Sequence, residues 1–170
     1  MRHSYLYEAS VPVFKRMLGN LADILGKAHA HAIARAIDPD VLLQQRLFPD
    51  MFPLSRQVQI ACDTAKLAVA RLSGQPAPVQ PDVEKTFPEL QSRIRDTLYF
   101  IDSIAPIAFD GSENRVVDIK QRDRTLSLDG KTYLQHLALP NFYFHLTTAY
   151  NLLRHNGVEI GKRDYLGPAE

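Results

Sequence analysis

The chain has 170 residues, with 20 Lys and Arg against 19 Asp and Glu, so its formal net charge at pH 7 is +1. Hydrophobic residues make up 45% of the sequence and charged residues 23%, which is typical of a soluble globular protein. The balanced charge argues against a nucleic-acid partner. The single cysteine, Cys62, excludes an intramolecular disulfide and a cysteine-rich zinc site.

No segment has the pattern of an export signal or a membrane span. The opening residues carry a charge at Glu8 before any apolar run has built up. No uncharged apolar run approaches the roughly 20 residues that cross a bilayer. We therefore expect a cytoplasmic protein without a membrane partner.

Apolar residues recur three and four positions apart in four segments, which predicts four amphipathic helices. These helices are expected at about 4–37, 54–72, 87–105 and 140–156. Pro12 either kinks the first helix or marks the start of a shorter one. Thr86 and Glu89 have the spacing of a capping box ahead of the third helix. The proline-rich residues 75–81 predict a stiff, extended linker.

Between the third and fourth helices the periodicity changes from helical to alternating. Apolar residues alternate with polar ones on either side of residues 121–124, which predicts a β-hairpin at about 115–128. We expect one domain over residues 1–170, of the all-α class. Its expected architecture is an up-and-down four-helix bundle with the hairpin inserted between helices three and four.

The six histidines include no pair with the spacing of a helical metal site, which is normally i, i+4. His29 and His31 are two apart, so they lie about 200° from each other around a helix. His145 and His155 are ten apart, roughly 15 Å along the axis of the last helix. Neither pair is expected to share a metal ion.

Polar residues beside the predicted core mark a candidate site. His145 lies at the edge of the last helix's apolar stripe, one turn after Asn141, and is either a buried histidine bonded to a neighbour or an acid, base or ligand. On the second helix, Arg56, Gln59, Asp63 and Lys66 form a polar stripe with apolar residues on both sides. That stripe indicates a groove or an internal network, or alternatively a solvated surface face.

Three consecutive aromatic residues on the last helix point to a partner. Phe142, Tyr143 and Phe144 spread over about 200° of the helix, so one core face cannot bury all three. The hairpin, the chain's tail or a second subunit must cover the remainder. We expect a homodimer through helix faces, although the tail is an alternative cover.

Three segments resemble a bacterial family that is a domain of unknown function. They are LPNFYFHLTTAY (139–150), GKRDYLG (161–167) and FPLSRQVQIACD (52–63). That family is similar to the DinB/YfiT-like superfamily of four-helix bundles, which are often dimeric. The resemblance implies a divalent metal held by three histidines, and in some members a low-molecular-weight thiol as cosubstrate.

This sequence departs from that histidine pattern. His145 matches one member of the pair expected on the last helix, but Asn141 and Ala149 stand four residues away from it, and residues 54–72 contain no histidine. Asp63 or Gln59 would have to replace a ligand.

Two functions follow from the resemblance and the residues. The protein binds a small molecule or partner at a polar site inside the bundle, formed by Arg56, Gln59, Asp63, Asn141 and His145. Alternatively, it is a thiol-utilising transferase in which His145 and Asp63 hold a divalent nickel, zinc or iron ion.

Overall fold

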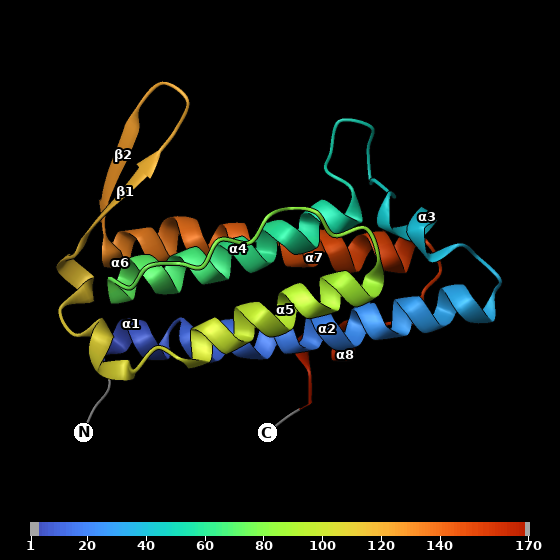
Figure 1. The fold of residues 1–170 in the computed structure, drawn as a ribbon, viewed down its shortest axis with the longest axis horizontal. Helices are drawn as coiled ribbons and strands as arrows, with labels where there is room; N and C mark the ends of the chain where they lie inside the picture. The colour runs from blue at the N-terminus through green and yellow to red at the C-terminus, as the bar shows by residue number, and fades with distance from the viewer. Residues whose placement is uncertain (1–3, 169–170) are drawn as a thin grey trace.

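A computed structural model, which describes residues 4–168, shows a mostly helical chain with one two-stranded sheet (Figure 1). The helices are α1 (Tyr5–Glu8), α2 (Val11–Ala34), α3 (Pro39–Leu43), α4 (Leu54–Ser73), α5 (Phe87–Asp102), α6 (Gly130–Tyr133), α7 (Leu139–His155) and α8 (Lys162–Leu166). Shorter turns are η1 (Pro106–Phe109), η2 (Ser112–Asn114) and η3 (Leu134–Ala138), and the strands are β1 (Val116–Lys120) and β2 (Thr125–Asp129). The ends of the expected domain, 1–3 and 169–170, lie outside the described residues.

The first predicted helix, 4–37, is shorter than expected and is preceded by a separate turn. The helical conformation is interrupted at Ser10, whose φ of −124° is not helical. Helix α2 then starts with Pro12 in its first turn. Proline has no backbone N–H and its ring clashes with the carbonyl four residues earlier, so α1 cannot continue into α2. At the other end, Ala36 has a φ of 54°, which stops the helix before residue 37.

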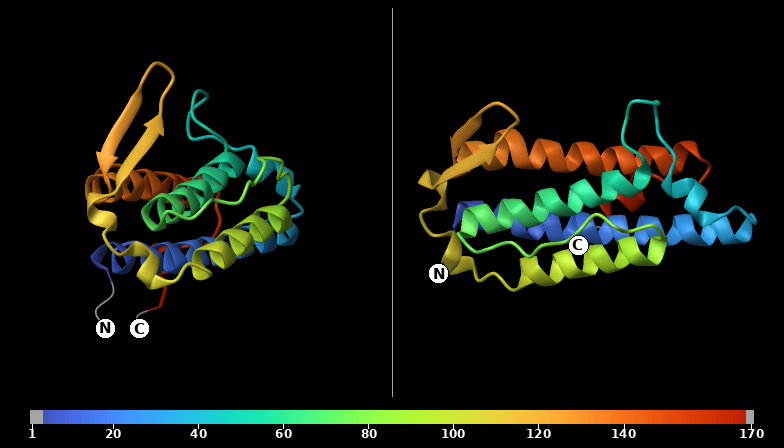
Figure 2. Two further views of the ribbon diagram at one scale, coloured as in Figure 1. Left: turned by 60° about the vertical axis from the view of Figure 1, so that its left-hand side comes forward. Right: turned by 45° about the horizontal axis from the view of Figure 1, so that its top comes forward.

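Helices α4 and α5 run in the same direction, because the linker between them crosses back along α4 (Figures 1 and 2). The start of α5 lies beside the end of α2, where His29 stacks on Phe87 with ring centroids 5.4 Å apart. Further along α5, the Gln91 side chain donates a hydrogen bond to the carbonyl of Ala22, so α5 is antiparallel to α2. The expected up-and-down alternation is therefore wrong between the second and third long helices.

The linker is long and stiff enough to permit this arrangement. A helix rises 1.5 Å per residue, so the 20 residues of α4 span about 30 Å. A proline-rich extended segment covers about 3.1 Å per residue, so roughly ten residues reach from one end of α4 to the other. Residues 74–86 are long enough to return the chain to the end of the bundle where α4 began.

The last long helix begins ten residues before the predicted start at residue 140. Asp129 caps α6, accepting a hydrogen bond of 2.9 Å from the Thr132 backbone N–H, and the chain stays helical from there to the end of α7. Pro140 therefore lies inside a helix, where its missing N–H would leave a carbonyl unpaired. The π-helical segment η3 immediately precedes it and changes the hydrogen-bond register at that point.

The predicted hairpin and the third and second helices are confirmed with small shifts. β1 pairs with β2 in an antiparallel register that runs from Val116 opposite Asp129 to Lys120 opposite Thr125. α4 ends one residue after the predicted limit. α5 ends at residue 102 instead of 105, since Pro106 forces Ala105 into an extended conformation.

The core lies between the four long helices. Phe14 of α2 and Phe142 of α7 are fully buried and meet edge to face, with ring centroids 4.9 Å apart. The tail returns to α2, where Asn20 donates a hydrogen bond of 2.9 Å to the carbonyl of Tyr165. Within residues 4–168, no helix is both long enough and apolar enough to cross a membrane.

Candidate functional site

The five residues predicted to form one polar site divide into separate environments around α4. Arg56, Gln59 and Asp63 contact the linker and α5. Asn141 and His145 of α7 instead contact Thr64 and Gln57 of α4. The structure therefore does not gather all five side chains around one cavity.

The first environment is an ion-pair network centred on Arg93 of α5, whose side chain is only 1% exposed. Its guanidinium donates to Asp63 at 2.8 Å and to the linker residues Asp82 at 2.9 Å and Glu84 at 3.0 Å. It also donates to the carbonyl of Pro81 at 3.1 Å. Arg93 thus joins α4, α5 and the crossing linker at a single buried point.

Other side chains of α4 complete this network. Gln59 donates to Glu84 at 2.9 Å, Lys66 forms an ion pair with Asp63 at 3.0 Å, and Arg56 pairs with Asp82. With Arg93, the network holds three basic and three acidic side chains, so it is electrically balanced. We call this set of seven residues the linker network. Its members are Arg56, Gln59, Asp63, Lys66, Asp82, Glu84 and Arg93. The polar stripe predicted on α4 is an internal network that holds the linker in place.

The second environment is the contact between His145 and Gln57. The Nδ1 atom of His145 lies 2.7 Å from Oε1 of Gln57, whose amide nitrogen donates to the carbonyl of Phe52 at 3.1 Å. Because Oε1 can only accept, Nδ1 carries the proton. Burial, and then the nearby positive charge of Arg56, hold the pKa of His145 below its ordinary value. His145 is therefore a buried, neutral histidine bonded to a neighbour.

The residues present do not fit the three-histidine metal site that the family resemblance implies. Asp63 is already paired with the two cations Arg93 and Lys66, which would oppose a third positive charge beside it. The Nδ1 atom of His145 is bonded to Gln57, so this histidine could offer an ion only its Nε2 atom. Among residues 4–168, no three His, Cys, Asp or Glu side chains come together as potential ligands. Asp63 and His145 contact different partners.

A groove of about 390 Å³ does bring three of the predicted residues together. We call it the α4–hairpin groove. Helix α4 contributes Arg56, Ile60, Asp63, Thr64, Leu67 and Arg71. The hairpin contributes Ile119 and Gln121, and the last helix contributes Tyr133, Leu137, Ala138 and Asn141. The groove is thus apolar along its walls and polar at several points.

Hydrogen bonds across the groove connect its elements. Asn141 donates to the hydroxyl of Thr64 at 2.8 Å, and Arg71 donates to the hydroxyl of Tyr133 at 3.0 Å. The guanidinium of Arg71 also lies 5.5 Å from the centre of the Tyr133 ring. These contacts hold α4 against the last helix at two points along the groove.

Arg71 and Tyr133 were not predicted from the sequence as site residues. A signal for Arg71 was available, because Ile60, Thr64, Leu67 and Arg71 follow one another at spacings of three and four and so share one face of α4. Tyr133 carried no such signal, since the sequence placed it before the start of the last helix.

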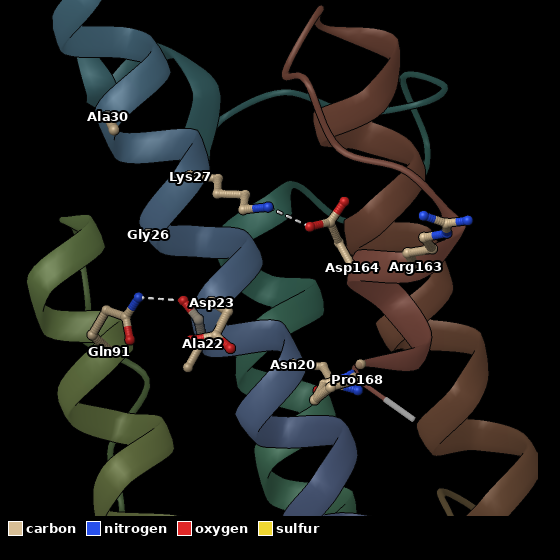
Figure 3. A pocket seen from close by; sticks show the side chains of 11 residues that line it. Asn20, Ala22, Asp23, Gly26, Lys27, Ala30, Gln91, Arg163, Asp164 and Pro168 are labelled. Carbon is tan, nitrogen blue, oxygen red and sulfur yellow. Dashed lines mark hydrogen bonds and ion pairs between the residues drawn. The ribbon is translucent and has the colours of Figure 1, made fainter. Parts of the chain in front are cut away.

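A larger concavity of about 630 Å³ lies on the other side of the molecule, between α2, α5 and α8 (Figure 3). Its polar side chains connect those helices. Lys27 of α2 pairs with Asp164 of α8, and Gln91 of α5 donates to the carbonyl of Ala22 (Figure 3). We therefore interpret this concavity as a seam between packed helices.

The fold is that of the DinB-like class of helical proteins. This chain is similar to a DinB family member protein from Shewanella denitrificans whose crystal structure is known, with 46% sequence identity and a TM-score of 0.89. The similarity covers 96% of this chain and 93% of that chain. The family model for the domain of unknown function DUF1993 matches residues 6–166. The chain belongs to this family. No curated protein matches it.

Proposed function

We propose that the protein binds a small molecule in the α4–hairpin groove. The observation that carries this proposal is that α4, the hairpin and the last helix converge on one concavity. Three of the residues expected from the sequence, Arg56, Asp63 and Asn141, line it. The linker network and the His145 contact are assigned to structure, since most of their polar groups pair with one another.

The groove's lining supports a small ligand with an apolar body. Its apolar lining is formed by Ile60 and Leu67 of α4, Ile119 of the hairpin and Leu137 of the last helix, and polar groups stand at a few positions between them. A mostly apolar surface with a few fixed polar groups is typical of small-molecule sites, whose volumes are about 300–1,000 Å³. At about 390 Å³ the groove lies near the lower end of that range, so a compact molecule fits best.

Binding of 1-naphthaleneacetamide, a compact neutral probe, tests the proposal. The chain contains no tryptophan, so naphthalene fluorescence can be followed against a low protein background. We expect saturable binding of one probe per chain, weakened at least tenfold in Leu67→Asp, because the new charge must be desolvated by the apolar probe. Val79→Asp, at a linker residue that is 94% exposed, is the matched control and should bind normally. Equal binding by both variants would place the probe elsewhere and refute the proposal.

We also propose that the chain is a cytoplasmic homodimer through the exposed face of α7. Phe142 is fully buried, but Tyr143 remains 38% exposed and Phe144 remains 55% exposed. The tail contacts this helix through a hydrogen bond between Thr147 and Tyr165, so it covers one side only. Light scattering after gel filtration should give twice the mass of one chain, and Phe144→Lys should halve it. The control Tyr99→Lys, at an 81% exposed position on α5, should leave the mass unchanged.

A further inference from the structure

Most charged groups in the α4–hairpin groove are already neutralised by partners outside it. Asp63 pairs with Lys66 and Arg93, and Arg56 pairs with Asp82. Such pairs leave little net charge to attract a ligand. Arg71 is different, and its surroundings indicate what the groove recognises.

Arg71 retains its full positive charge inside the groove. Its described partner is the neutral hydroxyl of Tyr133, and across residues 4–168 no acidic side chain forms an ion pair with it. A guanidinium stays protonated and carries five N–H groups in a plane. One of them is used by Tyr133, so a carboxylate can take a pair of the others.

Tyr133 adds a second donor next to Arg71. Its side chain is 2% exposed, and its hydroxyl oxygen accepts the hydrogen bond from Arg71. Burial raises the pKa of this phenol, an effect that Arg71 opposes, so the hydroxyl keeps its proton at neutral pH. That proton is available to an acceptor placed beside the guanidinium.

The π-helical turn places Tyr133 on the groove. Tyr133 and Asn141 are eight residues apart, which in a regular α-helix would put them about 80° from each other. One extra residue in a turn shifts the register by about 100°, so η3 reduces that difference to roughly 20°. Both side chains therefore line the same wall. Single π-helical turns occur often at functional sites.

Resting on the proposed function, we infer that the ligand of the α4–hairpin groove is a small monocarboxylate with an apolar body. Its carboxylate accepts hydrogen bonds from Arg71 and Tyr133. Its apolar body lies against Ile60, Leu67 and Leu137. The carboxylate complements the groove's uncompensated charge, and the walls exclude a second charged group.

Two probes that differ only in charge test this inference. The carboxylate of 1-naphthaleneacetic acid and the neutral 1-naphthaleneacetamide have the same ring and nearly the same shape, but only the first is an anion. We expect the wild-type protein to bind the acid at least about tenfold more tightly than the amide, since a hydrogen bond to a charged group contributes more than a neutral one. We expect Arg71→Gln to bind both probes with similar affinity.

Two further variants separate this site from a general effect of charge. Arg95→Gln removes an exposed arginine of α5 and should keep the tenfold preference for the acid. Tyr133→Phe removes one donor but keeps the ring, so the preference should fall about threefold or more; this variant also serves if Arg71→Gln does not fold.

The outcomes distinguish the inference from the proposed function. The wild-type protein could bind both probes with equal affinity, or the preference for the acid could survive in both Arg71→Gln and Tyr133→Phe. Either result refutes the inference of a monocarboxylate ligand but leaves the proposed small-molecule site in the groove intact. Absence of binding by either probe overturns both.

Discussion

The linker network offers the sharpest test of how this fold is held together. Arg93→Met removes the guanidinium but keeps an unbranched apolar side chain of similar reach, so the packing of the stem is largely preserved. The change leaves Glu84 with Gln59 as its described partner and leaves Asp63 with Lys66. Three carboxylates that shared one buried cation must then lie close together without it.

The cost follows from the burial of the partners. Breaking a buried ion pair by removing one member costs about 3–5 kcal/mol, because a desolvated charge is left behind. Asp63 and Asp82 are 27% and 38% exposed, so water offsets part of that cost and we expect about 3 kcal/mol. In a protein of this size, such a loss lowers the Tm by roughly 6–12 °C.

Urea denaturation measures the change in the free energy of unfolding, and trypsin reports on the linker itself. We expect cleavage after Lys85 to accelerate in Arg93→Met, because the linker is no longer tied to α4 and α5. The control is Arg95→Met, two residues away on the exposed face of the same helix, with an expected change within about 0.5 kcal/mol. A loss below about 1 kcal/mol in Arg93→Met, with unchanged cleavage at Lys85, would refute the structural role of the network.

Three further outcomes are expected. Stability should decrease as the pH falls below about 6.5, because the depressed pKa of His145 makes the unfolded chain bind the proton more readily than the folded one; urea titrations should show no such step in His145→Gln. The buried Cys62 thiol, with a pKa raised to about 12 by burial, should react with a thiol reagent only after denaturation, and rapid labelling of the native protein would contradict its position. Phe142→Ala should lower the free energy of unfolding by about 3–5 kcal/mol, whereas Phe144→Ala should change monomer stability by no more than about 0.5 kcal/mol; similar losses would contradict the assigned burial.

The sequence showed much of the candidate site as a pattern of polar residues, but it did not show which side chains contact one another. The polar stripe of Arg56, Gln59, Asp63 and Lys66 was predicted, with an internal network as one interpretation. In the structure these side chains pair with one another, with the linker and with α5. The network's central member, Arg93, was missed, because an arginine on α5 shows no periodicity that indicates burial. Its partners lie on the linker and α4, and only the folded linker brings them within 3.0 Å of it.

Short-range physics was enough to locate most helices and the hairpin. The capping box of Thr86 and Glu89, the apolar periodicity of α4 and the alternation in the hairpin each depend on residues close in sequence, so the chain displays them directly. The direction of α5 and the register shift before Pro140 depend on long-range packing. A linker that can span the bundle permits either direction, and the energy of packing α5 against both α2 and α4 selects one. The pairing of Arg71 with Tyr133 depends on the same packing, because the two residues are 62 positions apart in the chain.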